Sequence, residues 1–350
     1  MPEVRNAWYV AGWSHEVPRG RPAAVRVLNE PIVLWRDASG RILAFEDRCI
    51  HRLAPLSLGR CEGDALRCMY HGFLYDRDGR VVEIPGQERS ARNLRLRSYP
   101  AIERYGWTWV WMGEPGAADE GLIPSLIGME HPDYVSFHGE LEYAAAAHLV
   151  RDNLLDLSHV SFLHAHSFRL SEVWARERPN VTERARSVRS ERWIRNEGRL
   201  GMLESGEPQV DTYFRFEMFV PGVALFALWT FPPGTADATN GGPPDLSRPA
   251  DGFATQAVTP LTDRTARYLY INGDVRRGKE TSYDEGKRAV TEQAFSEDKA
   301  MIEAQQRNID STPDWRFLST GADRGVTIFN RLLERAAREE TAYPTVQQER

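Results

Sequence analysis

Two short groups of cysteine and histidine residues lie between Cys49 and His71. The first group is Cys49-x-His51, and the second, Cys68-x-x-His71, follows after 16 intervening residues. Thiolate sulfur and imidazole nitrogen are the protein ligands that zinc and iron–sulfur centres use. Two thiolates and two imidazoles on a pair of short loops therefore predict a metal-binding site.

Two kinds of metal centre fit this ligand set. One is a single tetrahedral zinc ion. The other is a [2Fe-2S] cluster with both cysteines on one iron and both histidines on the other, which is the Rieske arrangement. The order of the ligands favours the cluster, because each loop then supplies one ligand to each iron. Turn-forming residues nearby would let backbone amides point at sulfur and tune such a cluster; they are Pro55, Gly59, Gly63 and Gly72.

The residues around these ligands resemble the N-terminal domain of the Rieske non-haem iron oxygenases. The stretch CIHRLAPLSLG and the stretch CMYHGFLYD carry the resemblance. Ile50 departs from it, since many members of that family have proline there, but this position is not a ligand. Cys61 lies between the two loops, and we interpret it as a thiol without a metal-binding role, because a Rieske cluster needs only the four ligands named.

A second group of polar residues occurs in RDNLLDLSHVSFLHAHSF, residues 151–168. On a helix, Asn153, Asp156 and His159 would form one polar row among leucines, because residues three or four apart share a face. Burying such a row of polar side chains costs free energy unless its members are paired or bind a metal. His164 lies about 140° further round a regular helix, so it could share an ion with His159 only if the helix ends or bulges before it. His166 would lie about 10 Å along the axis.

The same family resemblance extends to this segment. It implies that His159 and His164 are ligands of a mononuclear iron, with Asn153 as a possible further site residue and His166 as an outer neighbour. A 2-His-1-carboxylate site also needs one carboxylate. The segment FSEDKAMIEAQQ resembles the family's third-ligand segment, which implies Asp298 as that ligand, with Glu297 as the alternative.

Asp156 has a separate role in the family. There, the equivalent aspartate connects the mononuclear iron site of one subunit to a Rieske histidine of the next subunit in a ring of three. The resemblance therefore implies that Asp156 links His159 to His71 of a neighbouring chain, and that the protein is a homotrimer.

Composition excludes several classes of protein. The chain has 350 residues, enough for two domains, and its hydrophobic (41%) and charged (27%) contents are ordinary for a soluble globular protein. A net charge of −6 argues against a nucleic-acid partner. Three cysteines cannot form a disulfide framework once two bind metal, which favours the cytoplasm. The sequence has no signal peptide pattern and no apolar run long enough to span a membrane.

The chain divides into two regions at the Gly- and Pro-rich residues 113–124. We expect an α+β protein, with an all-β Rieske domain at 1–118 and a catalytic domain at 119–350. The family resemblance implies that the catalytic domain is a helix-grip-like antiparallel sheet with helices. Strands are predicted at 24–28, 31–36, 41–46, 107–112, 134–144, 210–220, 223–231, 254–261 and 265–275, and helices at 145–164, 283–309 and 326–337. The tryptophans of 107–112 are expected to pack in the core. Residues 232–251 form a long Pro/Gly/Asp segment, expected to be a surface loop or a lid.

The resemblance implies a terminal oxygenase with one Rieske cluster, one mononuclear Fe(II) and O₂ as co-substrate. The sequence contains no convincing nicotinamide or flavin fingerprint, so electrons from NAD(P)H would arrive through a separate reductase, with or without a ferredoxin. The opening NAWYVAGWSHEV and the segment DNLLDLSHVSFLH are similar to the vanillate and dicamba O-demethylase group. This implies oxidative O- or N-demethylation of a small aromatic substrate with release of formaldehyde. Aromatic side chains on the central strands suggest an aromatic-sized cavity; they are Phe214, Phe216, Phe226 and Trp229.

Three alternatives remain open from the sequence. The chain could be the α subunit of an aromatic-ring dihydroxylating dioxygenase, or it could hydroxylate or N-dealkylate an aliphatic or steroid-like substrate. In a different class, it could be a Rieske electron carrier, or a zinc-stabilised binding module, without oxygenase activity. The second group of candidate ligands argues against this last class, because an electron carrier needs no second metal site.

Overall fold

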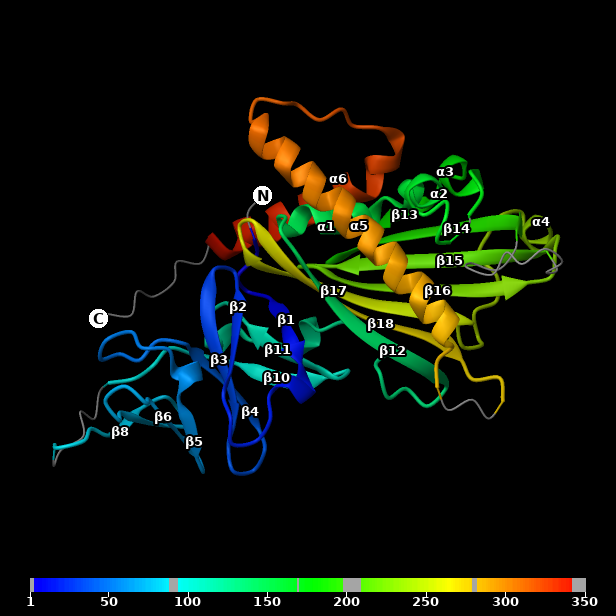
Figure 1. Cartoon of the computed structure of the whole chain (residues 1–350). Coiled ribbons are helices and arrows are strands. Elements are labelled where there is room, and N and C mark those ends of the chain that lie inside the picture. The colour runs from blue at the N-terminus through cyan, green and yellow to red at the C-terminus, as the bar shows by residue number, and fades with distance from the viewer. Residues whose placement is uncertain (1–2, 88–93, 169, 198–208, 279–281, 342–350) are drawn as a thin grey trace. The chain divides into compact units, whose positions relative to one another are not determined.

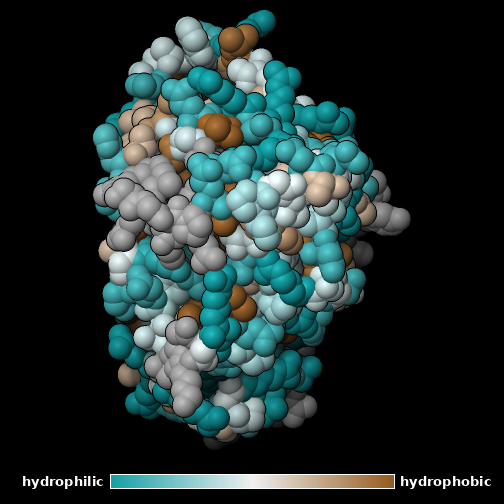
Figure 2. Space-filling view, turned by 90° about the vertical axis from the view of Figure 1, so that its right-hand side faces the viewer, coloured by the Kyte–Doolittle hydropathy of each residue, from teal (hydrophilic) through white to brown (hydrophobic). Residues whose placement is uncertain are grey.

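The computed structural model describes residues 3–87, 94–168, 170–197, 209–278 and 282–341. The chain forms two compact units. One contains Ser125–Val258 and Arg264–Ala336, and the other contains Glu3–Pro124, Thr259–Asp263 and the C-terminal residues from Ala337. On the face drawn in Figure 2, hydrophilic residues predominate, and hydrophobic ones are scattered among them.

The N-terminal unit contains three antiparallel β-sheets (Figure 1). The first has the order β1-β11-β10, the second β2-β3-β4-β9 and the third β5-β6-β7-β8. The strands are β1 Trp8–Trp13, β2 Ala23–Val27, β3 Glu30–Arg36, β4 Ile42–Glu46, β5 Arg60–Glu62, β6 Ala65–Arg67, β7 Leu74–Asp76, β8 Val81–Glu83, β9 Ser98–Tyr99, β10 Ala101–Arg104 and β11 Trp107–Trp111. Short 3₁₀ turns occur at η1 Ser14–Glu16, η2 Leu56–Leu58, η3 Pro115–Ala117 and η4 Glu120–Leu122.

Strand β11 carries the tryptophan stripe, and all five of its residues are buried. Trp107 lies against Trp13, and Trp111 against Trp8 across the β1–β11 pair, with ring centroids 6.0 and 5.6 Å apart. The prediction that these tryptophans are core residues is therefore confirmed. In the second sheet, the Glu30 carboxylate accepts a hydrogen bond from Tyr99 Oη at 2.5 Å and pairs with Arg97 at 3.0 Å and with Arg5.

The second unit is built on a seven-stranded antiparallel sheet with the order β12-β18-β17-β16-β15-β14-β13. Helix α5, Glu285–Ser311, runs across one face of this sheet (Figure 1). The strands are β12 Tyr134–Tyr143, β13 Asn180–Glu183, β14 Ser187–Glu197, β15 Val210–Phe219, β16 Val223–Phe231, β17 Gly252–Thr262 and β18 Thr265–Val275. The other helices are α1 Ala147–Leu155, α2 Val160–Leu163, α3 Val173–Arg176, α4 Thr235–Ala238 and α6 Arg324–Thr341, with 3₁₀ turns at η5 Leu157–His159 and η6 Gly321–Asp323.

One prediction about this unit is wrong. The helix expected at 145–164 ends at Leu155, and a 3₁₀ turn separates it from α2. The segment 232–251 lies mostly at the surface, as one of its two predicted alternatives stated, and it contains α4 and is hydrogen-bonded to the sheet: Trp193 Nε1 donates to Gly242 O at 2.9 Å, and Trp229 Nε1 donates to Arg248 O at 3.3 Å. None of residues 232–251 lines the cavity described below.

The other predicted elements match the structure to within a few residues. The Arg- and Glu-rich stretch that follows α2, to which no element was assigned, contains α3, β13 and β14. No helix in the described part of the chain has the length and apolar character needed to cross a bilayer.

Candidate metal centres

Cys49 and Cys68 lie on two loops with the same backbone pattern. In the first, Cys49 N donates to Ala54 O at 2.8 Å and Leu53 N donates to Cys49 O at 2.8 Å. In the second, Cys68 N donates to Phe73 O at 2.9 Å, and Gly72 N donates to Cys68 O at 3.0 Å. The residue four positions after each cysteine has a positive φ, 56° at Leu53 and 77° at Gly72. The two loops therefore hold their cysteines in the same backbone frame.

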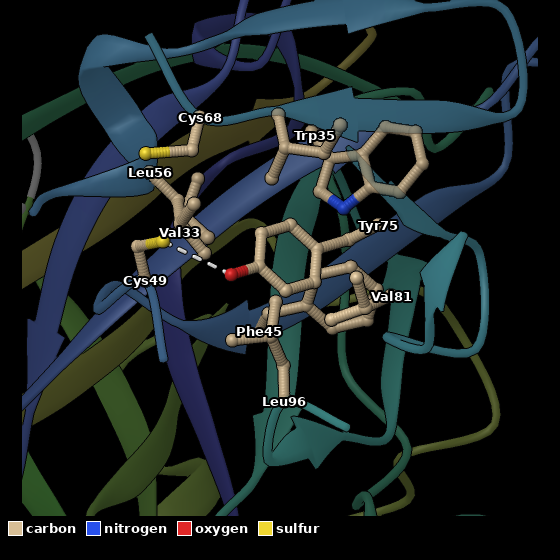
Figure 3. Packing of buried hydrophobic residues seen from close by; sticks show 10 residues of the cluster. Val33, Trp35, Phe45, Cys49, Leu56, Cys68, Tyr75, Val81 and Leu96 are labelled. Carbon is tan, nitrogen blue, oxygen red and sulfur yellow. Dashed lines mark hydrogen bonds between the residues drawn. The ribbon is translucent and has the colours of Figure 1, made fainter. Parts of the chain in front are cut away.

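Both thiols are buried in a packed hydrophobic cluster, whereas both imidazoles are exposed. Cys49 and Cys68 are 2% and 1% exposed, and Figure 3 shows their sulfur atoms at the same edge of the cluster. The rings of His51 and His71 lie 4.6 Å apart, centroid to centroid. Separation of sulfur ligands from nitrogen ligands fits a Rieske cluster, in which one iron takes both cysteines and the other takes both histidines.

Hydrogen-bond donors surround the two sulfur atoms. Tyr75 Oη lies 3.0 Å from Cys49 Sγ (Figure 3) and also accepts from Ile50 N at 3.3 Å. The backbone N–H groups of Tyr70 and His71 donate to the Cys68 sulfur. Donors aimed at sulfur stabilise the negative charge that a cluster carries, so this part of the site also fits a [2Fe-2S] group.

Cys61 lies apart from this ligand set. It is half-buried on β5, where it pairs with Leu66 of β6, and it packs against the edge of the hydrophobic cluster. Burial raises the pKa of the Cys61 thiol, so it is uncharged at neutral pH. This environment agrees with its interpretation as a thiol without a metal-binding role.

The break after α1 lets two histidines approach each other. Asp156 closes the helix, since its N–H donates to Asp152 O at 3.1 Å, and its Oδ1 then accepts Ser158 N at 2.9 Å. The chain turns, and the rings of His159 and His164 come to 5.3 Å, centroid to centroid. From the sequence, His159 and His164 could share an ion only if the helix ended or bulged before His164. The helix does end before it.

Asp298 completes a group of three ligand atoms that lie within 4.8 Å of one another and could hold one metal ion. Its Oδ1 lies 3.4 Å from His159 Nε2 and 3.3 Å from His164 Nε2. Asp298 belongs to the buried stripe of α5 that also contains Ala294, Ile302 and Gln306. Burial raises the pKa of Asp298, but hydrogen bonds from the two histidines outweigh burial and hold the pKa at about 2. The carboxylate is therefore ionised, as a metal ligand must be.

The Nδ1 atoms of His159 and His164 make contacts that fix the orientation of both imidazole rings. His159 Nδ1 lies 2.6 Å from the backbone oxygen of Asp156, and His164 Nδ1 lies 2.9 Å from Glu297 Oε2. These contacts leave Nε2 of each ring facing Asp298. Glu297, the alternative carboxylate, thus contacts the far side of His164 and also accepts Ser167 Oγ at 2.7 Å. Two imidazoles and one ionised carboxylate in this arrangement fit a mononuclear non-haem iron.

The remaining candidates in this segment lie around the three-residue group. Asn153 Nδ2 donates to Asp298 Oδ1 at 3.0 Å and lies 3.5 Å from His159 Nε2. The expected helical row of Asn153, Asp156 and His159 does not form, because Asp156 stands at the break between two helices. His166 is exposed to solvent.

A cavity of about 200 Å³ opens beside the three-residue group. Its walls are largely apolar and include Leu154, Leu157, Val160, Phe168, Leu170, Trp174, Phe226, Leu228, Phe253, Val290 and Phe295. Of the four aromatic residues suggested from the sequence, Phe226 lines the cavity. Phe214 packs behind Phe226 at 5.6 Å, centroid to centroid, and Trp229 belongs to a separate core cluster.

Sequence reasoning missed the polar residues of this cavity. Gln256 of β17 and Asn272 of β18 line it, as does the ion pair of Lys287 with Asp274. The available signal was a polar side chain in a strand that is otherwise apolar, as in FATQAV, residues 253–258. That signal does not tell which side of the strand faces a cavity.

Comparison with known proteins identifies the family. Residues 7–100 match the Rieske [2Fe-2S] domain, and residues 143–339 match the vanillate O-demethylase oxygenase C-terminal domain. The chain is 32% identical to the iron-sulfur subunit of the toluene-4-sulfonate monooxygenase system of Comamonas testosteroni, over 96% of this chain and 98% of that protein. It is also 32% identical to the vanillate O-demethylase oxygenase subunit of Pseudomonas sp. (strain ATCC 19151), over 90% and 97%.

Two crystal structures agree with this result. Dicamba monooxygenase bound to dicamba has a TM-score of 0.84 and 26% identity, with 98% of this chain and 100% of that chain covered. The same enzyme with non-haem iron and dicamba has a TM-score of 0.78 and 25% identity, over 98% and 99%. The chain therefore belongs to the Rieske non-haem iron oxygenases of the vanillate O-demethylase group, as the oxygenase component of a monooxygenase with a Rieske [2Fe-2S] cluster and a non-haem iron.

Proposed function

We propose that this chain is the terminal oxygenase of a multicomponent system that oxidatively demethylates a small aromatic compound. The observation that carries the proposal is the position of His159, His164 and Asp298 beside a largely apolar cavity of about 200 Å³. A substrate in that cavity is held next to the three ligand atoms. A bound iron supplies the activation of O₂.

The reaction balances as a monooxygenation. One oxygen atom of O₂ enters a C–H bond of a methyl group on oxygen or nitrogen. The other leaves as water, with two electrons and two protons taken up. The hydroxymethyl product then splits into formaldehyde and the demethylated compound. The names of the vanillate and dicamba O-demethylases support this choice for the present chain.

We assign the iron ligands as His159, His164 and Asp298. Glu297 then orients His164, and the backbone oxygen of Asp156 orients His159, so each ring offers Nε2 to the metal. Asn153, which donates to the Asp298 carboxylate, limits the rotation of that ligand. In the Rieske site we assign Cys49 and Cys68 to one iron and His51 and His71 to the other.

We further propose that the protein is a homotrimer in which Asp156 links His159 to His71 of a neighbouring chain. Electrons would come from NAD(P)H through a reductase, with or without a ferredoxin. The division into 1–118, which accepts electrons, and 119–350, which oxidises the substrate, belongs to the same proposal. The three free cysteines are consistent with the cytoplasm as its compartment.

Metal analysis of protein purified without oxygen tests the iron assignment. One Rieske cluster and one mononuclear iron correspond to about three irons and two sulfides per chain. His159→Ala should lose the third iron and formaldehyde release from aromatic methyl ethers, while its visible cluster spectrum stays unchanged. His166→Ala is the matched control, because His166 is exposed, and it should keep all three irons. Retention of the third iron by His159→Ala would remove the ligand assignment.

A further inference from the structure

Two buried amide side chains line the cavity, and one polar atom of each has no partner. Gln256 on β17 and Asn272 on the adjacent strand β18 both line it, and they are only 6% and 7% exposed. Among the described residues, Gln256 Oε1 and Asn272 Nδ2 have no hydrogen-bond partner. Buried polar groups are almost always paired in native proteins, and an unpaired one lowers stability. These two amides therefore require an explanation.

Both amides line the cavity, from the two adjacent strands β17 and β18. Residues two apart on a strand share a face, and Ala254 and Gln256 of β17 line the cavity together, as do Asn272 and Asp274 of β18. The neighbouring wall is apolar, so the two amides are polar groups in a mostly apolar surface. A substrate that fills the cavity would cover them.

We propose that Gln256 and Asn272 bind the polar end of the substrate, and that this end is a neutral group with one hydrogen-bond donor and one acceptor, such as a carboxamide or a lactam. This inference rests on the proposed function, because it assigns a substrate class to the same cavity. An amide side chain offers either its oxygen or its nitrogen after a half-turn of its end. The pair can therefore match a donor and an acceptor on the substrate in either order.

Apart from the proposed iron, the charges around the cavity disfavour an anionic substrate. Among the described residues that line it, Lys287 is the one lysine or arginine, and it already pairs with Asp274. An adjoining hollow shares Lys287 and Asp274 with the cavity and adds Asp251, Asp284 and Glu285 against Arg277. An anion would meet more carboxylates than cations there.

This substrate class differs from those of two relatives. Toluene-4-sulfonate and vanillate, for which those proteins are named, are anions. A preference for a neutral group would therefore distinguish this chain from them.

The test compares three probes that differ only at the polar end: 4-methoxybenzamide, 4-methoxybenzoate and 4-methoxytoluene. Binding to the metal-loaded enzyme is measured by isothermal titration calorimetry without oxygen, so that no turnover is needed. We expect the benzamide to bind at least about tenfold more tightly than either other probe. Equal or weaker binding of the benzamide would overturn the inference and leave the proposed function untouched.

Variants at the two positions separate recognition from a structural role. Gln256→Leu and Asn272→Leu should each weaken benzamide binding about tenfold without weakening methoxytoluene binding. Neither should lower Tm, because each replaces an unpaired buried amide by an apolar group of similar size. Asn180→Leu, at an exposed position on β13, is the matched control and should bind all three probes as the parent does. Unchanged benzamide affinity together with a lowered Tm in the cavity variants would show a purely structural role and refute the inference.

Formaldehyde release is then measured separately with oxygen and an electron donor. A benzamide that binds through these residues but yields no formaldehyde would support the amide recognition and contradict demethylation. The two proposals can thus fail independently.

Discussion

The hydrogen bond between Tyr75 and Cys49 offers a direct test of how the fold tunes the Rieske cluster. Tyr75 is fully buried, and its hydroxyl lies 3.0 Å from Cys49 Sγ. Burial and the neighbouring Cys49 sulfur raise the pKa of Tyr75, so its hydroxyl keeps its proton. A cysteine bound to iron is a thiolate without a proton. Tyr75 is therefore the donor, and Tyr75→Phe removes one hydrogen bond to the cluster.

The size of the effect follows from the charge of the acceptor. A hydrogen bond to a charged group contributes about 1.5–3 kcal/mol, and it is stronger when the cluster has gained an electron. If about 1–2 kcal/mol of this energy distinguishes the reduced from the oxidised state, its loss lowers the midpoint potential by about 40–90 mV for one electron. Tyr75→Phe should therefore make the cluster harder to reduce while its cysteine and histidine ligands stay in place.

The measurement is a redox titration of the purified protein, followed by the circular dichroism of the cluster. Tyr99→Phe is the matched control, since Tyr99 is also buried but donates to Glu30 and not to sulfur. We expect the parent potential in the control. A shift of less than about 10 mV in Tyr75→Phe, with an intact visible spectrum, would refute the reasoning. An equal shift in both variants would show that the effect is not specific to sulfur.

Three further predictions concern single carboxylates. Glu297→Gln should lower iron affinity or activity about 10- to 100-fold, because it disturbs the residue that orients an iron-binding histidine; iron content and kcat/KM measure this, with the exposed Glu292→Gln as control. Asp156→Asn should keep both metal centres yet slow electron transfer between them, and a normal product yield in a single turnover of pre-reduced enzyme would contradict its linking role. Glu30→Gln should lower the free energy of unfolding by about 1–2 kcal/mol at pH 7, because a tyrosine and two arginines contact that carboxylate. Burial raises the pKa of Glu30, but these contacts lower it below 4.5, so the contribution is complete above pH 4.5 and is lost as the pH falls through the lowered folded-state pKa. Urea unfolding should show the two proteins converging in acid, and a difference that persists there, or an equal effect of Asp64→Asn at an exposed pair, would contradict this account.

The candidate Rieske ligands could be proposed from the sequence because their chemistry needs particular residue types at short spacing. Cys49 and His51 are two residues apart, and Cys68 and His71 are three apart, so each loop holds its ligands with local backbone hydrogen bonds. The strands were predictable for a similar reason, because alternation and turn residues are local signals. None of these inferences required knowledge of distant contacts.

The polar residues that line the cavity could not be found in this way. Gln256 and Asn272 lie in strands that are mostly apolar, and each strand has two faces. Only the assembled sheet, with α5 across it, decides that this face encloses a cavity. The segment 232–251 shows the same limit. Its composition is typical of a loop, but Trp193 and Trp229 hold it to the sheet.

The break at Asp156 shows how one local feature can decide a distant site. A continuous helix would place His159 and His164 on different faces, whereas the break brings both Nε2 atoms to within 3.4 Å of the Asp298 carboxylate. Aspartate is a preferred residue at the start of a helical turn, where its carboxylate accepts a backbone N–H two or three residues later, so Asp156 was a possible signal in the sequence. It was ambiguous because the same aspartate also fits a helical polar row. The buried stripe of α5 resolves the ambiguity: Asp298 can meet both histidines only if the helix has ended, and the backbone oxygen released at the break then orients His159.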